Sequence, residues 1–273
     1  MIWQRMKNWN PYLKAGLIIT AVVLVITLIG VFVTPYNPTA MDAAHKMNPP
    51  SLAHLFGTDK FGRDILSRVL KGASTTISIA LSTVLIGMVL GTIIGAVTGY
   101  FGGIVDDILM RVNDALTAFP SILLALVVIG ILGPGLKINV IVALGIVFTP
   151  SFARVMRTQY ASIRESNYVT SARLMGASNA RILFVHILPN TLQVLLPAIT
   201  IGFNNAVLAE ASMSFLGIGV RPPESSLGYM LSEAQGIFAA APWYAVSTGI
   251  FIALTVFGAG LIGEGLQKAD KGI

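Results

Sequence analysis

The stretch Tyr168–Asn190, YVTSARLMGASNARILFVHILPN, lies between two strongly apolar segments and decides how the chain is organised. Arg173 and Arg181 interrupt it, and a charge at the centre of a bilayer costs roughly 2.5–3.5 kcal/mol on insertion scales. The stretch therefore cannot cross a membrane, whereas the apolar segments on either side can. A compact basic segment between two membrane spans is expected to be a docking surface for a soluble partner.

The local pattern of this stretch predicts two helices joined by a turn. Ser166 or Asn167 is placed to cap the first helix, and Gly176 to adopt the left-handed conformation that ends it. Ser178 is placed to cap the second helix, and Pro189 is expected to end it. We therefore predict a helical hairpin within a cytoplasmic loop at about 157–190.

Composition indicates a membrane protein. Charged residues make up only 11% of the 273-residue chain, whereas a soluble domain carries about 25%. The net charge of +6 is scattered between apolar runs and forms no stripe, so nucleic-acid binding is not expected. The chain has no cysteine, which excludes disulfides and thiolate metal sites.

Apolar segments that can cross a bilayer as helices predict an all-α polytopic membrane protein with six transmembrane helices. They cover about 15–34, 76–98, 120–132, 138–153, 191–208 and 243–262, the third being short. Six spans place both termini on one side, and the basic residues before the first span place that side in the cytoplasm. In this orientation eleven of the eighteen Lys and Arg residues lie on the cytoplasmic side. We therefore expect a multi-pass protein of the cell membrane, in contact with membrane lipid.

The predicted organisation has five parts. They are a cytoplasmic N-terminus at 1–14, a first transmembrane helix at 15–34, an external segment at 35–75, a five-helix core at 76–266 and a cytoplasmic tail at 267–273. The external segment ends in apolar residues at helical spacing, which predicts an amphipathic helix lying at the membrane interface. These residues are Ile65, Leu66, Val69 and Leu70. Within the core, residues 100–119 predict a cytoplasmic amphipathic helix and about 210–242 an external loop.

Four glycines lie along one face of the second span, at Gly87, Gly91, Gly95 and Gly99. Each lowers helix propensity by about 1 kcal/mol relative to alanine, so a run of four needs a reason. Small residues four apart allow the backbone of another helix to approach closely. We therefore predict that these glycines pack against a neighbouring helix.

Motifs for chemistry are missing from the sequence. No predicted span contains an acidic or basic residue, which argues against coupling to an ion gradient. There is no GxxxxGK[ST] phosphate loop, so energy from ATP has to come through another chain. Gly258, Gly260 and Gly263 spell GxGxxG, but inside an apolar run without βαβ context, and are interpreted as helix-packing glycines. We expect no catalytic residue, no metal site and no cofactor in this chain.

The stretch Glu210–Ala234 is too polar for a span and too apolar for a free loop. The Pro222-Pro223 pair keeps it from forming one long helix. Two interpretations stay open. One is an external gate or a contact for a substrate-delivering partner, with Glu210, Phe215, Gly217, Pro222 and Pro223 as candidate residues. The other is an ordinary packed loop.

Several ordered motifs resemble the permeases of ABC importers. His54–Arg68, HLFGTDKFGRDILSR, is similar to the signature of the second, C-type permease subunit of dipeptide, oligopeptide and nickel importers, with Phe56 in place of the usual leucine. MRVNDALTAFP, EASMSFLGIGVRPP and the ending LIGEGL resemble later segments of that family. Leu227 departs from it, because the family usually has tryptophan there.

The hairpin also resembles the cytoplasmic loop of these permeases. Gly176 and the Leu188-Pro189 pair match the family pattern. Thr170 and Ser171 depart from it, since they stand where the family has glutamate and alanine.

The resemblance implies a type I ABC importer permease fold, in which the chain forms half of a translocation pathway beside a homologous permease subunit. It further implies two ABC ATPase subunits that drive alternating access and an extracytoplasmic substrate-binding protein. The substrate would be a peptide, nickel or a metal-chelator complex. The ATPase subunits would dock on Tyr168, Ser171, Ala172, Arg173, Gly176, Ala177 and Ser178. The alternatives are a non-transporting membrane scaffold or channel component, and an ion-coupled secondary carrier.

Overall fold

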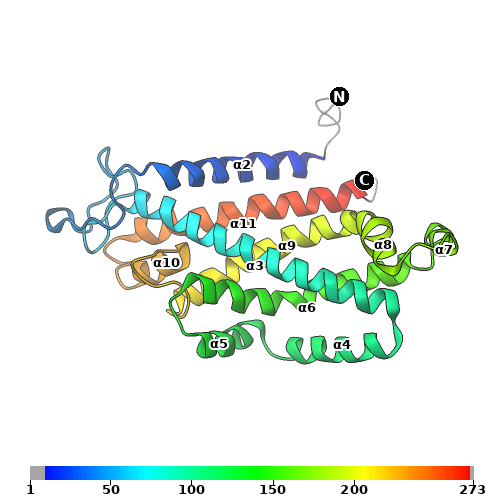
Figure 1. Cartoon of the computed structure of the whole chain (residues 1–273). Helices are drawn as coiled ribbons and strands as arrows, with labels where there is room; N and C mark the ends of the chain where they lie inside the picture. The colour runs from blue at the N-terminus through cyan, green and yellow to red at the C-terminus, as the bar shows by residue number, and fades with distance from the viewer. Residues whose placement is uncertain (1–9, 271–273) are drawn as a thin grey trace.

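The computed structural model describes residues 10–270, which form a bundle of long helices (Figure 1). The elements are α2 (Pro11–Phe32), a 3₁₀ turn η1 (Ala43–His45), α3 (Ile65–Phe101), α4 (Gly103–Thr117), α5 (Ser121–Leu132), α6 (Lys137–Ile163), α7 (Asn167–Leu174), α8 (Asn179–Arg181), a π-helical segment η2 (Ile182–Ile187), α9 (Leu188–Phe215), α10 (Leu227–Gln235) and α11 (Pro242–Asp270). The long helices run along one direction, so the bundle has two ends (Figure 1). The hairpin end carries α7 and α8, and the α10 end carries α10 and residues 33–64.

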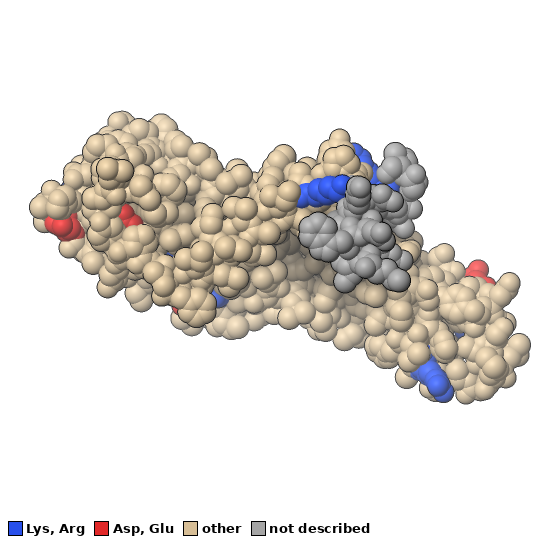
Figure 2. Space-filling view, turned by 90° about the horizontal axis from the view of Figure 1, so that it is seen from above, with Lys and Arg blue, Asp and Glu red and all other residues tan. Residues whose placement is uncertain are grey.

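Among residues 10–270, five helices are long and apolar enough to cross a membrane. The pair α4 and α5 passes the same test together but is bent by 93°, so the number of spans rises to six if that pair counts as one. Figure 2 shows the face that carries α2. Much of this face has neither acidic nor basic residues, and its charged residues lie toward the two ends. The predicted all-α polytopic fold is confirmed.

The amphipathic helix predicted at the membrane interface is not a separate element, and this expectation is wrong. Its residues form the first turns of α3, a single helix of 37 residues capped by the Asp64 carboxylate. Ile65, Val69 and Leu70 are buried inside the bundle. An apolar stripe on a helix fits a protein surface as well as a lipid surface, so periodicity alone could not separate the two.

Pro189 does not end a helix, contrary to prediction. Residues Asn179–Phe215 run on as one membrane-length element, and Pro189 lies in the first turn of α9 directly after η2. A π-helical segment changes the local hydrogen-bond register, and such a change accommodates the missing N–H and the bulk of the proline ring.

α9 also extends past the predicted end of the fifth span at residue 208, as far as Phe215. It therefore contains Glu210, whose side chain is fully buried near the α10 end of this helix. The Ser214 hydroxyl, one turn further along α9, donates a hydrogen bond of 2.7 Å to the Glu210 carboxyl. A local partner of this kind offsets part of the cost of burying a carboxyl group.

The pairing of α3 with α6 is the most extensive in the bundle, and the four glycines of α3 lie along it. A Cβ atom on Gly95 would lie 2.5 Å from the Ala153 carbonyl oxygen, and one on Gly99 would lie 2.4 Å from the Arg157 carbonyl oxygen. Such distances require that no side chain be present. The GxGxxG run also contains a glycine at a close helix contact. A Cβ on Gly258 would lie 2.7 Å from the Thr20 hydroxyl of α2.

Candidate functional site

The hairpin at one end of the bundle has the turn that its sequence predicts. α7 ends in a Schellman motif, in which the Gly176 N–H donates to the Arg173 carbonyl and the Ala177 N–H to the Ala172 carbonyl, both at 3.0 Å. Gly176 has a φ of +80°, the left-handed conformation that glycine adopts without strain. The Ser178 hydroxyl then caps α8 by accepting from the Arg181 N–H. These local bonds give the hairpin a defined shape.

Two tyrosines attach the hairpin to the long helices. The Tyr100 hydroxyl, near the end of α3, donates to the Asn179 side-chain oxygen at 2.9 Å and accepts from Arg173 at 3.4 Å. The Tyr160 hydroxyl, near the end of α6, donates to the Leu183 carbonyl at 3.1 Å. Both tyrosines are buried. A displacement of the hairpin would therefore act directly on α3 and α6.

All but one of the predicted docking residues have side chains or backbone at the surface of the hairpin. Tyr168, Ser171, Arg173, Gly176 and Ser178 are exposed and Ala177 is half-buried. Ala172, by contrast, is only 5% exposed, so its side chain offers little surface to a partner.

The most exposed large apolar side chains of the hairpin were not predicted as docking residues. Leu174 is 84% exposed and Met175 is 81% exposed, and together they form the apolar tip between α7 and Gly176. Apolar side chains on the cap of a polar segment are typical of a protein contact. The sequence signal was present, because two large apolar residues stand next to the turn glycine.

A buried ionic cluster lies at the opposite, α10 end. Arg68 of α3 contacts the Asp59 carboxylate at 2.5 Å, the Glu233 carboxylate of α10 at 2.6 Å and the Tyr244 hydroxyl of α11 at 2.7 Å. Arg63 contacts the same two carboxylates at 2.6 and 2.8 Å. The His54–Arg68 signature thus ties α3, α10 and α11 together. Sequence reasoning identified the signature but not its partners Glu233 and Tyr244.

The charges in this cluster compensate one another. Burial alone would raise the pKa of the Glu233 carboxyl, but the charge and hydrogen bonds of Arg68, together with Arg63, hold it below its ordinary value. Two arginines face two carboxylates, and a buried pair of this kind is stable only while every member is present.

The five candidate residues for an external gate do not form one site. Glu210 faces the interior of the bundle, and Phe215 is the last residue of α9. Gly217, with a φ of +78°, turns the chain out of α9. Pro222 and Pro223, joined by a cis peptide bond, are exposed and line a cavity at the α10 end.

Known proteins resemble this chain over nearly its whole length. The dipeptide transport system permease protein DppC of Alkalihalophilus pseudofirmus is 37% identical over 260 residues, which is 95% of this chain and 85% of that protein. The glutathione transport system permease protein GsiD of Escherichia coli O6:K15:H31 is 39% identical over 268 residues, covering 98% and 88% respectively.

A solved structure of the MetNI methionine ABC transporter, in inward facing conformations, shares the fold. Its TM-score is 0.57 at 22% identity, over 73% of this chain and 96% of that chain. The family of binding-protein-dependent transport system inner membrane components matches residues 87–269. The chain belongs to this family, as its motifs predicted.

Proposed function

We propose that the chain is one permease subunit of an ATP-driven importer of small peptides. It would form half of the translocation pathway beside a homologous permease subunit, with two ATPase subunits at the hairpin end. A substrate-binding protein would deliver substrate at the α10 end. Relatives named for dipeptide and glutathione transport support the substrate class. Nickel and metal-chelator complexes, the other substrates that the signature suggested, have no such support among these relatives.

The anchored hairpin is the observation that carries this proposal. Its tip exposes Leu174 and Met175, whereas its inner side is bonded to Tyr100 and Tyr160 of the long helices. A soluble partner that grips the tip could therefore move α3 and α6 as it changes shape. In this orientation both chain termini and the basic residues of the hairpin lie in the cytoplasm, in agreement with the distribution of Lys and Arg.

The test separates docking from folding. We expect Leu174→Asp with Met175→Asp to leave the protein in the membrane, because neither side chain is packed, but to abolish co-purification of the ATPase subunits and ATP-dependent uptake. Leu52→Asp is the matched control, since Leu52 is 99% exposed at the opposite end. Normal ATPase co-purification with the tip variant would overturn the proposal.

The two remaining functional classes predict different behaviour. A secondary carrier would take up substrate after ATP depletion and lose uptake when the ion gradient collapses. A scaffold or channel component would retain no ATPase and pump nothing against a gradient. Uptake into vesicles with ATP supplied or withheld therefore distinguishes all three.

A further inference from the structure

A groove of about 150 Å³ lies between α6 and α9, in the middle part of the bundle. The α6 side consists of Phe148, Ser151, Phe152 and Val155, whose spacing of i, i+3, i+4 and i+7 is that of one helical face. The α9 side has four residues at the same spacing, the last of which is Asn205. At 1.5 Å per residue, Ser151 is about 20 Å from the start of α6 and Asn205 about 15 Å from the end of α9. The groove is therefore well inside the membrane-spanning part.

Two polar side chains in this groove, those of Ser151 and Asn205, are exposed. Within residues 10–270 neither of them has a hydrogen-bond partner. A hydroxyl or amide that faces hydrocarbon without a partner costs roughly 2–7 kcal/mol relative to water. Lipid is therefore an unfavourable neighbour for this face, whereas water is a favourable one.

The polar face of α6 continues toward the hairpin end. Arg154, three residues after Ser151, forms an ion pair of 3.0 Å with Asp114 of α4, and both side chains are exposed. Residues three apart lie on the same side of a helix, so this ion pair and the Ser151 hydroxyl share one face. An exposed ion pair is stable in water and costly in hydrocarbon. The side of the bundle formed by α4, α6 and α9 thus has polar groups along its length.

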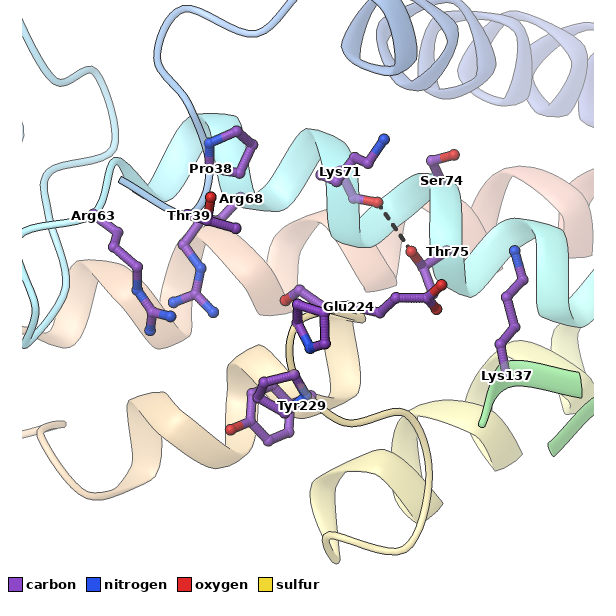
Figure 3. A pocket seen from close by; sticks show the side chains of 13 residues that line it. Pro38, Thr39, Arg63, Arg68, Lys71, Ser74, Thr75, Lys137, Glu224 and Tyr229 are labelled. Carbon is purple, nitrogen blue, oxygen red and sulfur yellow. Dashed lines mark hydrogen bonds between the residues drawn. The ribbon is translucent and has the colours of Figure 1, made fainter. Parts of the chain in front are cut away.

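Other hollows of the bundle have a different lining. A groove of about 650 Å³ between α9, α10 and α11 has only apolar side chains, Leu254 among them, as suits contact with lipid. A cavity of about 340 Å³ at the α10 end has charged side chains, including Lys71, Lys137 and Glu224 (Figure 3). Charges at the end of a span are solvated in any membrane protein. Unpaired polar groups deep in the bundle are therefore the better indication of a path for water.

We propose that the groove between α6 and α9 faces the water-filled translocation pathway, and that Ser151 and Asn205 contact the solute as it passes. Its volume is below the roughly 300–1,000 Å³ of small-molecule sites, so it forms one wall of a path and does not hold the solute alone. The hydroxyl and the amide both donate and accept hydrogen bonds without carrying charge. They therefore contact uncharged polar groups of the solute and do not select its charge. The passage of solute rests on the proposed function, whereas the access of water rests on the unpaired polar groups.

Single cysteines test this inference, because the chain has no cysteine of its own. Ser151→Cys and Asn205→Cys are compared with Leu254→Cys, which lies at a similar depth in the apolar groove, 12 residues after the start of α11 at Pro242. The assembled transporter, with cysteine-free partner subunits, is treated with a charged methanethiosulfonate reagent with and without ATP. Ser151→Cys and Asn205→Cys should react at least about tenfold faster than Leu254→Cys in one of the two conditions, because a thiol surrounded by hydrocarbon does not ionise to the reactive thiolate.

Modification should also block ATP-dependent uptake by the Ser151→Cys and Asn205→Cys variants. An uncharged maleimide that enters lipid should modify Leu254→Cys without blocking uptake. Reaction as slow as that of Leu254→Cys, with and without ATP, would overturn the proposal in favour of a dry contact with lipid or with the second permease subunit. Fast reaction that leaves uptake unchanged would overturn it as well. In both cases ATP-dependent uptake leaves the proposed function standing, whereas uptake without ATP would remove that function and leave the reaction rates as the measure of water in the groove.

Discussion

Substitution of Gly95 by alanine tests whether α3 and α6 must lie in backbone contact. The added Cβ would stand 2.5 Å from the Ala153 carbonyl oxygen and 2.7 Å from the Arg157 nitrogen, whereas ordinary contact begins at 3.4 Å. Both atoms belong to the backbone and cannot rotate away, so the two helices must separate by about 1 Å. Overpacking of this kind costs roughly 1–3 kcal/mol.

A matched variant isolates this packing cost from helix propensity. Gly249→Ala makes the same change in the interior of α11, where a Cβ would meet nothing within 4 Å. Both variants gain the same propensity of up to about 1 kcal/mol, so the difference between them reports packing alone. Thermal unfolding of the purified assembly should place the Gly95 variant several degrees below the Gly249 variant, at about 2–4 °C per kcal/mol. Equal melting temperatures would refute the close contact of α3 with α6.

Two further predictions concern the ends of the bundle. Glu233→Gln should destabilise the protein by roughly 3–5 kcal/mol at neutral pH, since it leaves Arg68 without its full charge compensation. The pKa of Glu233 in the folded protein lies below the ordinary 4.5. The wild type is therefore more stable than the variant by the full amount above about pH 5, and this difference in the free energy of unfolding shrinks as the pH falls through the lowered pKa. Melting temperatures of both proteins between pH 7 and pH 4 check this, and an advantage that grows on acidification would contradict it. At the hairpin end, Tyr100→Phe removes the bond to Asn179 and should reduce uptake per ATP hydrolysed, whereas Tyr36→Phe, which loses an exposed bond to the Ala53 carbonyl, should not. Equal uptake per ATP hydrolysed in the two variants would show that the Tyr100 hydrogen bond does not contribute to coupling.

The sequence was sufficient for features that depend on local chemistry. Spans follow from apolar length, the hairpin turn from Gly176, and the α3 contact from glycines four residues apart. In each case a short stretch contains the whole physical cause. The family was likewise predictable, because its motifs are contiguous.

Features that depend on tertiary contact could not be predicted in the same way. Glu210 reads as the start of a polar loop, and only the neighbouring turn of α9 reveals how a helix accommodates it. Ala172 belongs to the hairpin motif, but its burial depends on how α7 packs. The partners of Arg68 lie more than 160 residues away in the chain, at Glu233 and Tyr244. Such long-range pairs leave no periodic pattern in the sequence.

The unbroken length of α3 has a consequence for how the two faces of the membrane communicate. At 1.5 Å per residue its 37 residues reach about 55 Å, and they carry Arg68 near one tip and Tyr100 near the other. Because α3 is continuous from Ile65 to Phe101, a single element joins the two ends of the bundle. A displacement of Tyr100 at the hairpin end is therefore expected to act on the ion pairs of Arg68 at the α10 end, and a substitution at either position is expected to affect the other.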